Sequence, residues 1–191
     1  MKRKVILITD GDYVAREAVE EVARQVGGRS ISASAGNPTP LSGEQLVELI
    51  LQAKHDPVLV MFDDCGSGGR GRGERAMEYV ANHPEVEVLG AVAVASNKRD
   101  GEGVPVDILL DRDGNRVMHG VDKDGMEMEG EPPVIWGDTV EVLNKMDVPI
   151  IVGIGDIGKM DHFDDVKRGA PVTRKAVELI LAFSGNKTNR K

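Results

Sequence analysis

The sequence predicts an α/β fold in three layers, with a mostly parallel open sheet of about five strands and helices on both faces. Short apolar runs rich in Val and Ile, typical of buried parallel strands, alternate with segments whose apolar residues follow helical spacing. This Rossmann-like order implies right-handed crossovers. The chain has 191 residues. We expect residues 1–185 to form a single domain and residues 186–191 to be a flexible tail.

The first strand and helix are predicted over residues 5–28. Residues 5–8, Val-Ile-Leu-Ile, form a β-branched apolar run that predicts a buried strand. Asp12 then begins a helix, and Gly27-Gly28 ends it. The apolar residues between them recur at helical spacing. A short strand over 29–32 and a loop over 33–41 follow.

The next elements repeat the alternation of helix and strand. Ser42 and Gln45 form a capping-box pattern that begins the second helix. A strand over 57–62 follows it and leads into a glycine-rich loop. A third helix over 74–82 then precedes a long apolar strand over 86–95.

The second half of the chain is less regular. Asp113-Gly114 lies between two apolar runs, 104–110 and 116–118, and predicts a small β-hairpin insertion. We expect Asp138 and Glu141 to cap a short helix. A buried strand over 148–152 and a last helix over 173–183, ended by Gly185, complete the prediction.

Composition excludes several classes of function. Asp and Glu number 32 against 24 Lys and Arg, a net charge of -8, which argues against a nucleic-acid partner. The single cysteine excludes an intramolecular disulfide and a multi-cysteine metal cage. No apolar run approaches the roughly 18 residues of a membrane-spanning helix. We therefore expect a soluble, intracellular protein. The sequence is compatible with a monomer and with a homo-oligomer.

Carboxylates gather where the predicted strands end. The five residues concerned are Asp10, Asp12, Asp63, Asp64 and Asp156. Because the carboxyl ends of parallel strands share one edge of a sheet, these side chains are candidates for a Mg²⁺ or Ca²⁺ site. The alternative is that an Asp after a strand only caps the following helix, as Asp12 would do.

A glycine-rich loop after residue 64 is a candidate anion site. Glycines let backbone N–H groups approach an anion, and arginines bind phosphate or carboxylate in a bidentate manner. The candidate residues are Gly66, Ser67, Gly68, Gly69, Arg70 and Arg72. The loop lacks the Lys-Ser/Thr pair of a phosphate-binding P-loop, and the alternative is a flexible surface turn.

A second glycine motif follows the strand over 148–152. Gly153, Gly155 and Lys159 belong to the sequence GIGDIGK, which matches G-x-G-x-x-G. The dinucleotide interpretation lacks the helix, strand and acidic residue that should come next. We expect a tight turn that lines the same strand-end site and contributes to ligand binding.

Several stretches together resemble one protein family. They include MKRKVILITDGD, DPVLVMFDD, VEVLGAVAVAS, GVDKDG, VPIIVGIGDIGKM and KRGAPVTRKAVELIL, and they span about residues 1–185. The chain is similar to the stage V sporulation protein AE family. The resemblance implies an accessory protein of the spore system that moves dipicolinic acid, acting in spore formation or germination. Membrane proteins of that channel would be its partners, placing it in sporulating cells, peripheral to the spore inner membrane.

A weaker, structural resemblance offers an enzyme as the alternative. Asp10-Gly11 and Asp63-Asp64 are similar in placement to the acidic residues of Toprim domains, which bind Mg²⁺ for phosphoryl transfer. This resemblance implies a Toprim-like phosphotransferase or hydrolase. The sequence departs from that pattern, because Asp replaces Glu before the glycine and the Asp-x-Asp alternation is missing. It identifies no catalytic residue with a defined role.

Overall fold

A seven-stranded sheet forms the middle layer of the chain in the computed structural model, which describes residues 1–65, 70–99 and 101–188. The strands lie in the order β2-β3-β1-β4-β9-β6-β7. Their bounds are β1 Arg3–Ile8, β2 Arg29–Ser30, β3 Val58–Met61, β4 Val86–Val94, β6 Ile108–Leu110, β7 Arg116–Val117 and β9 Ile151–Ile154. All neighbours pair in parallel except β6 and β7. The predicted α/β class with a mostly parallel open sheet is therefore confirmed.

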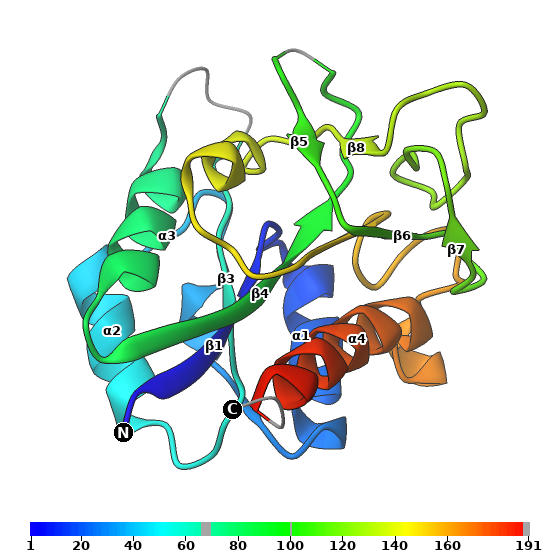
Figure 1. The fold of residues 1–191 in the computed structure, drawn as a ribbon. Coiled ribbons are helices and arrows are strands. Elements are labelled where there is room, and N and C mark those ends of the chain that lie inside the picture. Colours follow the sequence, from blue (N-terminus) through cyan, green and yellow to red (C-terminus); the bar gives the residue numbers. More distant parts are fainter. Residues whose placement is uncertain (66–69, 100, 189–191) are drawn as a thin grey trace.

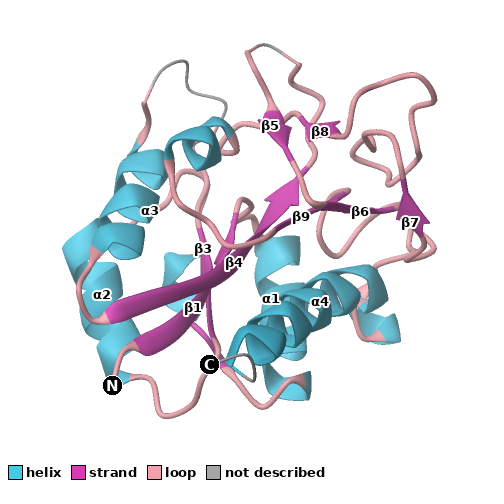
Figure 2. Cartoon of the chain, viewed as in Figure 1, coloured by secondary structure: helices cyan, strands magenta, loops and turns pink. Residues whose placement is uncertain are grey.

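Helices cover both faces of this sheet (Figures 1 and 2). Helices α1 (Tyr13–Gln25) and α4 (Pro171–Thr188) pack on one face. On the other lie α2 (Gly43–Gln52), α3 (Arg72–Asn82) and the 3₁₀ helix η2 (Glu141–Lys145). Alternate strand residues supply the two cores, since side chains along a strand point to opposite faces.

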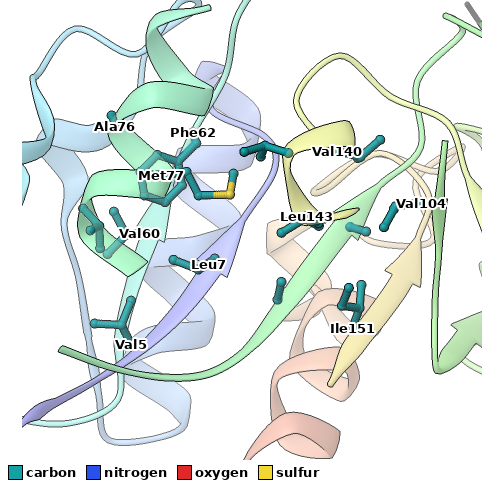
Figure 3. Packing of buried hydrophobic residues seen from close by; sticks show 14 of the residues in the cluster. Val5, Leu7, Val60, Phe62, Ala76, Met77, Val104, Val140, Leu143 and Ile151 are labelled. Atoms are coloured by element: carbon teal, nitrogen blue, oxygen red, sulfur yellow. The ribbon is translucent and has the colours of Figure 1, made fainter. Parts of the chain in front are cut away.

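The strand β1 shows this alternation. Val5 and Leu7 belong to the core under α2 and α3, whereas Ile6 and Ile8 belong to the core under α1 and α4. Figure 3 shows the first core, in which Leu7 lies near Phe62 and Met77. Burial of both faces explains why the strand is a continuous apolar run and not an alternating one.

Local signals place the first helices. The Asp12 side chain caps α1 by accepting a hydrogen bond from the Ala15 N–H at 2.8 Å. Ser42 and Gln45 make both hydrogen bonds of the capping box at α2. Both caps agree with the sequence prediction, because capping depends on residues within one turn of each other.

Two predictions about later elements need correction. The expected strand over 104–110 is divided: β5 (Val104–Pro105) pairs with β8 (Val134–Ile135) in a separate antiparallel sheet, while β6 joins the main sheet. The hairpin β6–β7 is confirmed. The Asp138 side chain does not cap η2, which follows Val140 without a side-chain cap.

The last helix is longer than predicted. Gly185 does not end α4, which continues to Thr188, so residues 186–188 are helical. Residues 189–191 of the predicted flexible tail lie outside the described residues. Two further 3₁₀ helices, η1 (Ser32–Ser34) and η3 (Val166–Arg168), complete the elements. Within the described ranges, no helix has both the length and the apolar character of a membrane span.

Candidate functional site

Three carboxylates from distant parts of the sequence meet at the carboxyl edge of the sheet. Asp10, Asp12 and Asp156, here called the acidic cluster, each place one oxygen within 4.8 Å of the others. Asp10 and Asp156 come two residues after the last residues of β1 and β9, the strands on either side of β4. Parallel pairing thus brings both strand ends to one edge, as the sequence predicted.

Asp10 is the buried member of the acidic cluster. The residue is only 8% exposed, and its Oδ1 accepts a hydrogen bond from the Gly11 N–H at 2.7 Å. Oδ2 is buried and has no hydrogen-bond partner among the residues that the structure describes. Burial, and then the negative charges of Asp12 and Asp156, raise the pKa of Asp10 well above its ordinary value. The folded chain therefore holds a buried carboxyl oxygen that no donor of the described residues satisfies.

Lys159 provides a positive charge to the acidic cluster. Its Nζ lies 2.5 Å from Asp12 Oδ2 and 3.0 Å from Asp156 Oδ2. Partial burial opposes the charge, yet the ion pairs with both aspartates raise the pKa of Lys159 above its ordinary value. With all groups ionised, three carboxylates and one ammonium leave a charge of about −2, which equals the charge that a divalent cation neutralises.

The glycine motif after β9 shapes the turn that carries Asp156 and Lys159. A Cβ at Gly155 would come within 2.7 Å of the Gly125 nitrogen, so the glycine admits the loop 122–125 against the end of β9. The Asp156 N–H donates to the Lys123 carbonyl of that loop at 2.7 Å. Gly153 lies within β9 against Ile135. Gly153 and Gly155, which were predicted to bind an anion, thus allow close packing of neighbouring segments. Lys159, the third residue of that prediction, contacts the acidic cluster.

Asp63 lies beside the acidic cluster but outside its group of ligand oxygens. Its Oδ1 accepts from the Cys65 N–H at 3.0 Å, and the residue is 9% exposed. Burial raises the pKa of Asp63, with contributions from the charges of Asp138 and Asp12. Asp63 thus adds negative potential near Asp12.

Asp64 caps a helix instead of facing the acidic cluster. Its Oδ1 accepts from the Gly73 N–H at 2.6 Å and its Oδ2 accepts from the Glu74 N–H at 3.0 Å, at the start of α3. A Cβ at Gly71 would overlap this carboxylate, which explains the glycine there. The acids expected of a Toprim-like enzyme, Asp10, Asp63 and Asp64, are thus not the three that the structure brings together.

The arginines of the predicted anion loop point to other partners. Arg70 forms an ion pair with Glu78 on α3. Arg72 donates from Nη2 to the Pro40 carbonyl at 2.9 Å. The partner of Arg70 is on α3, the partner of Arg72 is in the loop before α2, and neither belongs to the acidic cluster. The other members of that prediction, Gly66, Ser67, Gly68 and Gly69, lie outside the described residues.

Sequence reasoning missed Asp164, a fully buried carboxylate that positions the Lys159 turn. Its Oδ2 accepts from the Gly158 N–H at 2.8 Å and the Thr173 hydroxyl at 2.6 Å. Its Oδ1 accepts from the N–H groups of Val172 and Thr173 at the start of α4. No local cap signal identifies it, because Asp164 precedes that helix by seven residues.

Sequence reasoning also missed the position of Asp138. Although Asp138 was expected only as a helix cap, its charge acts on Asp63, and its buried Oδ1 has no hydrogen-bond partner within residues 1–65, 70–99 and 101–188. The neighbouring Gly137 packs against the Val94 carbonyl at the end of β4. This placement depends on how the segment after β8 folds back over the sheet, for which the sequence offers no short-range signal.

Comparison with known proteins gives one match. A family model described as stage V sporulation protein AE1 matches residues 4–184. The match contains every residue of the acidic cluster as well as Lys159 and Asp164. Neither the curated proteins nor the solved structures give a match.

Proposed function

The chain belongs to the stage V sporulation protein AE family and is a sporulation-related protein, and from this premise we propose that it is a cation-binding accessory protein of the spore dipicolinate system. In this proposal it docks on the membrane proteins of the dipicolinate channel, peripheral to the spore inner membrane. The acidic cluster binds one divalent cation, Ca²⁺ or Mg²⁺, and the chain performs no catalysis of its own.

One observation carries the cation part of the proposal, namely the unpartnered Oδ2 of the buried Asp10. A buried carboxylate oxygen without a donor costs free energy, which folded proteins usually avoid. Asp10 also places one oxygen within 4.8 Å of oxygens of Asp12 and Asp156, so that like charges surround this buried carboxylate. A hard divalent cation removes both penalties together, because carboxylate oxygens are its preferred ligands.

The docking part is supported by family membership and by the charge of the chain. The net charge of -8 disfavours direct attraction to anionic lipid headgroups. Membrane proteins with basic surfaces are therefore the class of partner that we propose.

Isothermal titration calorimetry tests the cation site. We expect saturable heat from Ca²⁺ or Mg²⁺ with the wild-type chain, and a loss of at least about tenfold in affinity in Asp10→Asn, which removes one ligand charge. Dipicolinate is titrated separately and together with Ca²⁺, to detect binding of the chelate.

Asp147→Asn is the matched control, because it makes the same substitution at an exposed carboxylate just before β9, at the opposite end of that strand. We expect this variant to bind as the wild type does. An absence of heat with every cation, or equal affinity in Asp10→Asn and wild type, would refute the cation site.

A further inference from the structure

We infer that Lys159 is a built-in occupant of the cation site, and that a divalent cation binds by displacing its ammonium from Asp12 and Asp156. The inference rests on the proposed cation site and describes how that site is regulated. Lys159 Nζ contacts two of the three candidate ligands, at 2.5 Å and 3.0 Å. An ion bound to all three carboxylates would need the space and the oxygens that this ammonium now uses.

The charges explain why the ammonium leaves one ligand unsatisfied. Lys159 pairs with Asp12 and Asp156, whereas the buried Oδ2 of Asp10 has no hydrogen-bond partner in the described part of the chain. The single positive charge of Lys159 therefore neutralises only part of the acidic cluster. A divalent ion carries twice the charge and coordinates several oxygens at once, so that it also satisfies Asp10. The exchange of lysine for a divalent ion is thus favoured by the third carboxylate.

Exposure makes the displacement feasible. The Lys159 side chain is 39% exposed, so its ammonium can turn into solvent without unfolding the chain. The backbone beneath it is fixed independently, because the Gly158 N–H donates to Asp164 and the Asp164 N–H donates to the Lys159 carbonyl. Movement of the flexible lysine side chain can therefore open the site while Asp156 stays in place.

The residues after Lys159 hold an unusual backbone conformation. Met160, Asp161 and His162 have φ values of 51°, 52° and 69°, a left-handed turn formed by three consecutive non-glycine residues. Such residues store conformational strain and occur mainly where the surrounding structure holds them in place. The Asp164 N–H closes this turn by donating to the Lys159 carbonyl at 3.1 Å, so the turn stays in place when the ammonium moves.

Substitution of the lysine tests the inference by calorimetry. Lys159→Gln removes the competing charge, and we expect it to bind Ca²⁺ at least about tenfold more tightly than the wild type. Lys159→Arg keeps a positive charge and is expected to bind no more tightly than the wild type. Lys167→Gln is the control, because it removes a positive charge from an exposed lysine on η3.

Chemical labelling provides a second test that needs no variant. An acylating reagent needs an amine that is accessible and free of ion pairs, so we expect the wild-type Lys159 to label faster with saturating Ca²⁺, because displacement frees its Nζ from Asp12 and Asp156. Lys167 is the internal reference in the same mass spectrum, and its labelling should not change.

The outcomes separate the inference from the proposed function. Calcium binding with unchanged Lys159 labelling, or with weaker binding in Lys159→Gln, would overturn the displacement and leave the cation site intact. An absence of calcium binding in the wild type and in Lys159→Gln would overturn both. Tighter binding in Lys159→Gln together with faster labelling in the wild type would support both.

Discussion

The buried carboxyl group of Asp10 connects the stability of the chain to the chemistry of its candidate site. Asp10→Asn replaces the carboxylate by a neutral amide whose NH₂ group can donate toward Asp12 or Asp156. We expect this substitution to raise the free energy of unfolding at pH 7, without divalent cations, by about 1–3 kcal/mol, the usual cost of an unsatisfied buried polar group. Urea denaturation measures the change. A substitution that removes a charge and makes the protein more stable is typical of a functional site, because such sites often reduce stability.

The same residue predicts the sign of the pH dependence. The pKa of Asp10 in the folded chain lies above the value of 3.8 expected after unfolding. Between these two values the folded chain retains a proton that the unfolded chain has lost, so stability falls as pH rises through this interval. We expect the decline to be smaller in Asp10→Asn and unchanged in Asp147→Asn. A variant less stable than wild type at pH 7 would contradict an unpartnered carboxylate.

At the scale of elements, the connection between β9 and α4 depends on Asp164. Its carboxylate accepts four hydrogen bonds, from Gly158, Val172 and twice from Thr173. Asp164→Ala leaves these buried donors unsatisfied and removes the cap of α4. We therefore expect a loss of about 2–4 kcal/mol in the free energy of unfolding, measured by chemical denaturation.

Asp165→Ala is the neighbouring control. The Asp165 side chain is only half-buried and caps the short helix η3 through the Lys167 N–H. Its removal should cost less than about 1 kcal/mol, within the usual range for a single cap. Equal losses in both variants would mean that Asp164 has no special role in joining the Lys159 turn to α4.

The elements that could be predicted are those fixed by neighbours in the sequence. Helix α2 follows from its capping box, and β1 follows from its β-branched run. The division between β5 and β6 could not be predicted, because it depends on pairing with β8, about thirty residues away. Gly185 was expected to end α4, but the helix continues through it to Thr188, and a Cβ at this position would meet nothing within 4 Å.

At the scale of the whole molecule, parallel topology made the candidate site partly predictable. The ends of β1 and β9 lie at one edge of the sheet, so Asp10 and Asp156 meet there although 146 positions separate them. Asp64 could not be excluded by the same reasoning. Adjacent residues on a strand point in different directions, and the start of α3 takes the Asp64 carboxylate as its cap.

The charge of the whole molecule yields a last prediction, about how it reaches a membrane. A chain of net charge -8 is repelled by the negative surface potential of anionic phospholipids. We therefore expect the purified protein to remain unbound in flotation assays with phosphatidylglycerol vesicles at low salt, where electrostatic effects are largest. Vesicles that contain the channel membrane proteins should carry it to the lipid fraction. Flotation with protein-free vesicles in the presence of a chelator would show that lipid itself is the partner and would contradict docking through proteins.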